Sequence, residues 1–210
     1  MPLTIAHISP NAAQADSDGD GVGDACDLGP GAHSLRFYSM LRAESAGLMG
    51  DATWQPNDDA WLFSSSSAGY VEVPSALHQT SVTLGVTVTA LGATGRRQIA
   101  VLASDDDTGS YLYNQYFQSG GNAQVYVMRA DGGDQFTTLD FSQTAGPFVL
   151  GDVQFQAIYQ PSQERSETRA LLNGTPFSIA AATGPQVARN GFAVRFEGIT
   201  AQLRYIAIVQ

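Results

Sequence analysis

The sequence predicts an all-β protein, and three observations support this fold class. The 210 residues include 22 glycines and only 14% charged residues, and all ten basic residues are arginines, which excludes long helices built on lysine–glutamate pairs. Apolar and polar residues alternate with a period of two over several segments. Turn signals separate these segments at short, regular intervals. Together these features favour a β-sandwich.

The clearest strand is Ser81–Ala90, where Val82, Leu84, Val86 and Val88 alternate with serine, threonine and glycine. No amphipathic helix has that period, so we expect a strand with one wet face. Further strands are expected over Asp152–Tyr159, Gly191–Glu197, Arg97–Ala103, Ser110–Phe117, Ala123–Arg129, Phe136–Phe141 and Leu203–Val209. A total of eleven to thirteen strands predicts two packed sheets, because one flat sheet of that size would expose an apolar face.

The chain is expected to divide into an acidic N-terminal segment, residues 1–33, and a β-sandwich domain, residues 34–210. The first 34 residues contain five aspartates and no lysine or arginine, and Asp27–His33 reads as a short glycine–proline linker. Within the domain, Leu35–Met49 fits a helical stripe or a strand equally well. The segment Glu164–Arg169 is expected to form a charged hairpin loop after Pro161.

A formal net charge of -10 disfavours nucleic acid and anionic membrane surfaces as partners and favours cations. No apolar run approaches the length of a membrane helix, and Leu3–Ile8 is too short and lacks the basic flank of a signal peptide. The single cysteine, Cys26, excludes an internal disulfide.

Residues 16–27 read DSDGDGVGDACD and have the spacing of a twelve-residue calcium loop. Calcium takes six to eight oxygen ligands, which alternate residues of a tight loop can supply, and glycine at position 6 permits the sharp turn. An acidic solvated linker with chance spacing is the alternative. A helix–loop–helix hand is disfavoured because position 12 is an aspartate that leads into Leu28-Gly29-Pro30. The expected metal ligands are Asp16, Asp18, Asp20, Val22 through its carbonyl, Asp24 and Asp27.

Asn11–Asp27 closely resembles the thrombospondin type 3 repeat, whose calcium-binding pattern ends in aspartate-x-cysteine-aspartate. In that family the loops stack in secreted, disulfide-linked arrays, and a second cysteine follows the first. Here Leu28 and Gly29 stand in its place. The resemblance therefore implies either the last repeat of a longer array or a free thiol at Cys26, and an extracellular or cell-surface location.

The rest of the chain resembles the concanavalin A-like and laminin G-like jelly-roll domains. The resemblance lies in Gly69–Pro74, which leads into the strand at Ser81–Ala90, and in the closing Leu203–Val209. It implies a domain that binds carbohydrate or matrix ligands, often beside a calcium ion. Because no catalytic motif is present, we expect a non-catalytic recognition or adhesion module. It transfers no individual binding residue.

Two further groups of residues are candidate sites. Asp105 and Asp107 could hold a second metal ion with Asn114 or Asp131, although a solvated acidic turn explains them more simply, since contiguous aspartates cannot all face one ion. Trp54 and Trp61 flank a segment that reads as an exposed loop, so they are the best candidates for stacking against sugar rings. The other aromatic residues considered for that role are expected mostly in the core: Tyr111, Tyr113, Tyr116, Phe117 and Tyr126.

No nucleophile motif, phosphate loop or paired-histidine motif is present in the sequence. Two alternatives to a binding module stay open. One is a sandwich-type glycosidase or lyase, which requires a groove with two carboxylates drawn from Glu72, Glu164, Glu167 and Glu197. The other is a purely architectural spacer.

Overall fold

The structure is a computed structural model that describes residue 17 and residues 34–40, 48–57, 59–73, 80–93, 95–105, 110–131, 136–144, 146–160, 165–172, 175–183 and 191–210. Within these residues the chain forms fifteen β-strands, and every pairing between them is antiparallel. No helix in this part of the chain is long and apolar enough to span a membrane. The predicted all-β class is confirmed.

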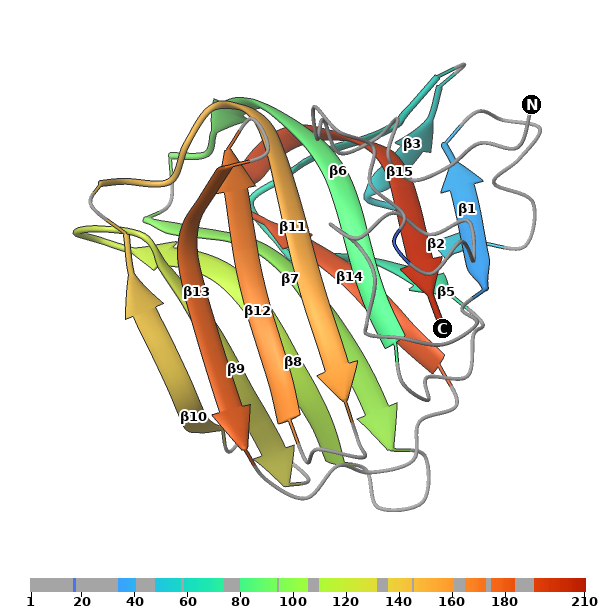
Figure 1. Cartoon of the computed structure of the whole chain (residues 1–210). Helices are drawn as coiled ribbons and strands as arrows, with labels where there is room; N and C mark the ends of the chain where they lie inside the picture. The colour runs from blue at the N-terminus through green and yellow to red at the C-terminus, as the bar shows by residue number, and fades with distance from the viewer. Residues whose placement is uncertain are drawn as a thin grey trace.

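The strands form two sheets that pack face to face (Figure 1). The eight-stranded sheet has the order β13-β12-β11-β6-β15-β4-β3, and β1 also pairs with β15. Its strands are β1 (Leu35–Ser39), β3 (Trp54–Pro56), β4 (Trp61–Ser65), β6 (Thr80–Leu91), β11 (Gly151–Gln160), β12 (Arg165–Leu172), β13 (Thr175–Thr183) and β15 (Ile199–Val209).

The seven-stranded sheet has the order β10-β9-β8-β7-β14-β5-β2. Its strands are β2 (Met49–Gly50), β5 (Gly69–Val73), β7 (Arg96–Asp105), β8 (Ser110–Ser119), β9 (Gln124–Asp131), β10 (Phe136–Gln143) and β14 (Gly191–Glu197). At one side of the sandwich the edge strands β10 and β13 lie next to each other (Figure 1).

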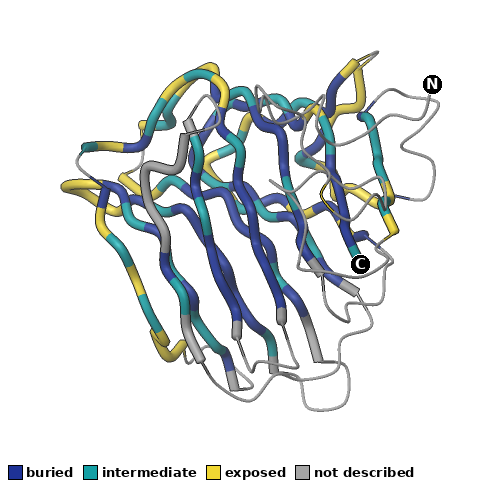
Figure 2. Tube along the Cα trace, in the orientation of Figure 1, coloured by how far each residue is buried: buried dark blue, intermediate teal, exposed yellow. Residues whose placement is uncertain are grey.

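The core lies between the sheets and consists of alternate residues from both (Figure 2). In β6 the inward residues are Val82, Leu84, Val86 and Val88, each 2% exposed or less, which confirms the predicted alternation. The other strands expected from the sequence are also present. Between β8 and β9, Gly120 and Gly121 have φ of 74° and 59°, so this hairpin uses glycine where a left-handed backbone is required.

The structure corrects several expectations. Fifteen strands are described rather than eleven to thirteen, and the ambiguous segment 35–49 contains the strand β1. Residues 165–169, which were expected in a charged hairpin loop, belong instead to the strand β12, Arg165–Leu172. Its inward residues Ser166 and Thr168 are polar, so the apolar alternation that marks most strands is missing.

A buried polar contact joins the two sheets between β8 and β12. The Asn114 amide on β8 donates to Thr168 Oγ1 at 2.7 Å, to Ser166 Oγ at 3.2 Å and to the carbonyl of Glu167 at 3.2 Å. Asn114 and Thr168 are fully buried. Because a buried polar group costs free energy unless it is hydrogen-bonded, these partners explain why an amide is tolerated in the core.

Candidate functional site

The outer face of the seven-stranded sheet carries side chains that point away from the core. Its composition is unusual for a solvated face, because aromatic rings and planar polar groups predominate. One row runs straight across the strands through paired residues, from β5 to β10, and consists of Tyr70, Arg195, Ala100, Gln115, Tyr126 and Phe141. Such a face differs from the simple polar face that an antiparallel sheet presents to water.

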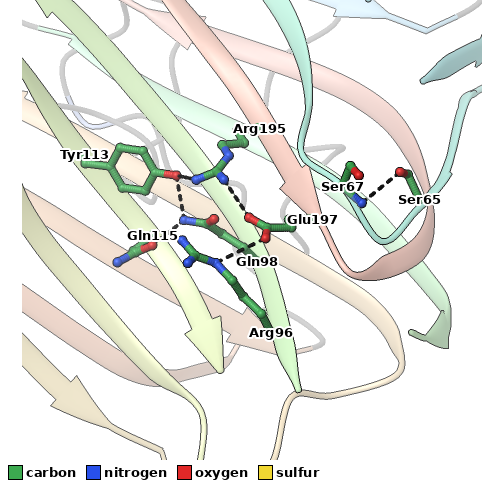
Figure 3. Close-up of polar contacts among 8 residues, drawn as sticks. All are labelled: Ser65, Ser67, Arg96, Gln98, Tyr113, Gln115, Arg195 and Glu197. Carbon is green, nitrogen blue, oxygen red and sulfur yellow. Dashed lines mark hydrogen bonds and ion pairs between the residues drawn. The ribbon is translucent and has the colours of Figure 1, made fainter. Parts of the chain in front are cut away.

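Arg195, on β14, links the side chains of Tyr113 and Glu197 on this face (Figure 3). Its guanidinium carbon is 5.6 Å from the ring centroid of Tyr70 and 5.8 Å from that of Tyr113. Its Nη2 pairs with Glu197 Oε2 at 2.6 Å, and its Nη1 donates to the hydroxyl of Tyr113. Cation–π contacts and a charge-assisted hydrogen bond therefore hold the guanidinium in one place.

Buried glutamines extend this cluster along β7 and β8. Gln98 Nε2 donates to Tyr113 Oη at 2.7 Å and to Gln115 Oε1 (Figure 3). Gln115 Nε2 in turn contacts Met128 Sδ. Gln98 is fully buried although it lies on the outer face. Gln98 Oε1 and Arg195 Nε are buried without a hydrogen-bond partner among the described residues. The cluster thus holds more hydrogen-bonding capacity than the described residues use.

The protonation states in the cluster are fixed at neutral pH. Burial raises the pKa of Tyr113 to about 12, against the smaller opposing effect of Arg195. Burial alone would lower the pKa of Arg195, but Tyr113, Tyr70 and Glu197 together raise it. Tyr113 therefore stays a neutral hydroxyl and Arg195 stays a cation.

Arg96 adds an accessible cation to this face. Its side chain is 54% exposed, its Nε is 3.2 Å from Glu197 Oε1, and its guanidinium carbon lies 5.4 Å from the ring centroid of Phe117. Glu197 thus bridges two arginines (Figure 3).

Two groups of aromatic rings stand on β8, β9 and β10, and we call them the first and second ledge. In the first ledge the ring of Phe136 contacts those of Tyr111 and Tyr113, with centroids 6.0 and 5.9 Å away. In the second ledge the ring of Phe141 stacks on Tyr126, with centroids 5.7 Å apart and planes 26° apart. Phe136 is 47% exposed and Phe141 is 54% exposed. Each ledge therefore exposes one large apolar ring to solvent on this face.

The structure reverses the expectation for the aromatic residues. Residues 55–57 and 59, which lie between Trp54 on β3 and Trp61 on β4, are exposed as expected, but the two tryptophans are each only 5% exposed. The ring of Trp54 packs at 4.9 Å from Phe196 and 5.2 Å from Phe63. Their rings fill the core, so the exposure on which their candidacy rested is wrong.

Of the aromatic residues expected in the core, Tyr116 does pack there, stacked on Phe148 with centroids 4.2 Å apart. Tyr111, Tyr113, Phe117 and Tyr126 lie instead on the outer face. Alternation along β8 could have separated Tyr116 from its neighbours, but aromatic residues occur on both faces of that strand, and composition alone did not show which face was solvated.

The candidate metal ligands fall mainly outside the described residues. This holds for Asp16, Asp18, Asp20, Val22, Asp24, Asp27 and Asp107. The backbone register places Asp105, Ser110 and Asp131 side by side at the end of β7, β8 and β9. Asn114 is committed to Ser166 and Thr168 in the core, so it is not available to a metal ion at that end. Among the described residues no group of three or more histidine, cysteine, aspartate or glutamate side chains is placed to hold a metal ion.

The glutamates required by the glycosidase alternative are dispersed. Glu72 on β5 lies opposite Ala193, four residues before Glu197, so the two glutamates are about 13 Å apart along the strands. Paired glycosidase carboxylates stand about 5 to 9.5 Å apart. Glu167 is in the other sheet, where it pairs with Arg169, and Glu164 lies outside the described residues.

The sequence matches no family model and no curated protein. Solved structures, however, share the fold. The exoplasmic/lumenal domain of VIP36, in a form bound to Ca2+ and Man3GlcNAc, has a TM-score of 0.60 at 12% identity and covers 81% of this chain and 87% of its own. The carbohydrate-binding module CBM66 from Bacillus subtilis has a TM-score of 0.55 at 12% identity, with 75% and 92% covered.

A legume lectin-like domain from Entamoeba histolytica has a TM-score of 0.56 at 7% identity, and covers 77% of this chain and 88% of its own. At these identities the likeness establishes the fold alone. The chain is therefore a lectin-like jelly-roll β-sandwich, as the resemblance to concanavalin A-like domains implied.

Proposed function

We propose that this protein is a carbohydrate-recognition module that binds its ligand on the outer face of the seven-stranded sheet and catalyses no reaction. One observation carries the proposal: exposed aromatic rings stand beside a fixed arginine cluster on one solvent face of a lectin-like sandwich. Structures of this fold include lectins and a carbohydrate-binding module, which adds support at the level of the fold.

The chemistry of the face suits sugars. Aromatic rings pack against the C–H groups of a pyranose, while planar guanidinium and amide groups exchange hydrogen bonds with its hydroxyls. Arg195 is held between Tyr70 and Tyr113, so little side-chain entropy is lost when a ligand binds there.

The proposal is tested by affinity electrophoresis and calorimetry with a panel of soluble polysaccharides, comprising xylan, mannan and mixed-linkage β-glucan. The wild type is expected to bind at least one of them, and Phe136→Ala is expected to weaken binding about tenfold, since it removes an exposed ring that packs on Tyr113 beside Arg195. Leu150→Ala is the matched control, because Leu150 is 57% exposed and precedes β11 in the other sheet. Unchanged binding in Phe136→Ala would move the site away from this face.

We also propose that residues 16–27 bind calcium as a thrombospondin type 3-like repeat, and that the protein acts outside the cell or at its surface, where matrix ligands are available. The support for this loop is its aspartate spacing. Asp105 and Asp107 remain candidates for a second ion.

A further inference from the structure

We infer that the outer face reads an extended run of sugar units that lies along β10, rather than a single terminal sugar. The inference rests on the proposed function and specifies the class of ligand. It comes from the spacing of the two ledges, from the strand irregularity that aligns them, and from their position on an edge strand.

The ledges are separated by more than one ring. Phe136 pairs with Ala130 and Phe141 pairs with Tyr126, and these two residues are four positions apart on β9. Four residues of extended strand span about 13 Å, so one sugar ring cannot contact both phenylalanines. A ligand that uses both ledges must continue from one to the other along β10.

A β-bulge in β10 places both phenylalanines on the same face. They are five residues apart, and in a regular strand an odd separation would put them on opposite faces. The register shifts between Thr138 and Asp140, where Leu139 is the extra residue, and the shift restores Phe141 to the outer face. The bulge therefore exposes the Phe141 ring to solvent when a regular strand would bury it in the core. This exposure favours a role for the ring in binding rather than in packing.

The stretch between the ledges can hydrogen-bond. Thr138 is exposed and lies opposite Met128 on β9. Beyond Phe141, Gln143 is exposed and pairs with Gln124, whose Oε1 accepts a hydrogen bond from Tyr126. Rings at each end with hydroxyl and amide groups between and beyond them match the alternating C–H faces and hydroxyls of a sugar chain.

The edge position leaves room for a continuing chain. β10 is the last strand of its sheet, and its residues are mostly exposed (Figure 2). An exposed edge strand also suits pairing with a second copy of the protein. We favour the sugar chain, because the bulge interrupts the straight row of backbone groups that strand pairing needs, and the rings stand on the face of the sheet rather than along its edge.

The test is calorimetry with xylo-, manno- and cello-oligosaccharides of increasing length, starting from the monosaccharides. The dissociation constant is expected to fall by about five- to tenfold once the chain reaches the second ledge, and then to level off. Phe136→Ala and Phe141→Ala are each expected to remove this gain while short-chain binding persists at the remaining ledge. Leu150→Ala should keep the full length dependence.

The outcomes separate the two proposals. Equal affinity for a monosaccharide and for longer chains would overturn the inference and leave the proposed function standing. Failure of every oligosaccharide and polysaccharide to bind would overturn the proposed function as well. A concentration-dependent dimer in sedimentation experiments that Phe136→Ala and Phe141→Ala abolish, without any length dependence of sugar binding, would assign the ledges to self-association instead.

Discussion

Asp140 Oδ2 accepts a hydrogen bond from the backbone N–H of Ala181 at 2.8 Å, and this contact joins the edge strands of the two sheets. Asp140 is on β10 and Ala181 is on β13. The bulge at Leu139 that returns Phe141 to the outer face also turns Asp140 toward the other sheet. One backbone irregularity therefore closes this side of the sandwich and orients the second ledge.

Replacing Asp140 by alanine is expected to lower the free energy of unfolding by about 1–3 kcal/mol. The substitution leaves the Ala181 N–H without its acceptor and removes a hydrogen bond to a charged group. Urea unfolding followed by circular dichroism measures the change. Asp59→Ala is the control, since Asp59 is exposed and should shift stability by less than about 0.5 kcal/mol. Equal urea midpoints for the two variants would show that the contact does not stabilise the sandwich.

Replacing Gly85 by alanine is expected to destabilise the eight-stranded sheet by about 1–3 kcal/mol. A Cβ at residue 85 would overlap the ring of Tyr205, which lies across β6. That ring is held on its other sides, because Gln154 Nε2 donates to its hydroxyl at 2.8 Å and Phe37 lies 5.6 Å away between centroids. The ring cannot shift without losing these contacts.

Two comparisons make the Gly85 prediction specific. In a Tyr205→Ala background, Gly85→Ala should cost much less, because the overlapping ring is gone, and a double-mutant cycle by urea unfolding measures that coupling. Gly95→Ala should be close to neutral, since nothing lies within 4 Å of the Cβ it would add. If Gly85→Ala lowers the free energy of unfolding equally with and without Tyr205, the destabilisation does not come from overlap with that ring.

Strands in which buried apolar residues alternate with exposed polar residues could be predicted from the sequence. A strand whose inward residues are polar could not. Val82 to Val88 and the strand Gly191–Glu197 follow that alternation. β12 does not, because its inward Ser166 and Thr168 serve the Asn114 amide of the opposite sheet, a long-range contact invisible in a local window. Because the inward and the outward residues of β12 are both polar or charged, the sequence pattern predicts a loop there.

The candidate site was missed for a related reason. Phe136 and Phe141 lie on the same face because of the bulge. No turn residue in Phe136–Gln143 indicates that bulge in the sequence. Conversely, Trp54 reads as exposed because polar residues follow it, whereas the β3–β4 hairpin turns its ring into the core. Sequence patterns showed which residue types were available, and the pairing register decided which of them met on one face.

Calcium is expected to bind residues 16–27 and to be lost in Asp18→Ala. Five carboxylates in twelve residues repel one another, and a cation relieves that repulsion. With a dissociation constant of about 0.1 mM, typical of extracellular modules, about 2 mM calcium would stabilise the folded loop by about 1.8 kcal/mol. Calorimetric titration of the full chain should show a binding heat that Asp59→Ala retains. Equal heats for wild type and Asp18→Ala would exclude the loop as the site.

Stability is expected to fall in alkali through Tyr113 and Tyr116. Burial raises the pKa of each hydroxyl to about 12, above the ordinary value near 10. The folded state therefore holds these protons more tightly than the unfolded state, so their contribution is complete below about pH 10 and is lost as the pH rises toward 12. Urea unfolding at a series of pH values measures how steeply the free energy of unfolding falls with pH.

The Tyr113→Phe variant makes this prediction specific. At neutral pH it should be less stable than the wild type, because Arg195 and Gln98 lose their shared hydroxyl, but its stability should fall less steeply with pH. A slope identical to that of the wild type would mean that Tyr113 ionises as readily in the folded cluster as in the unfolded chain.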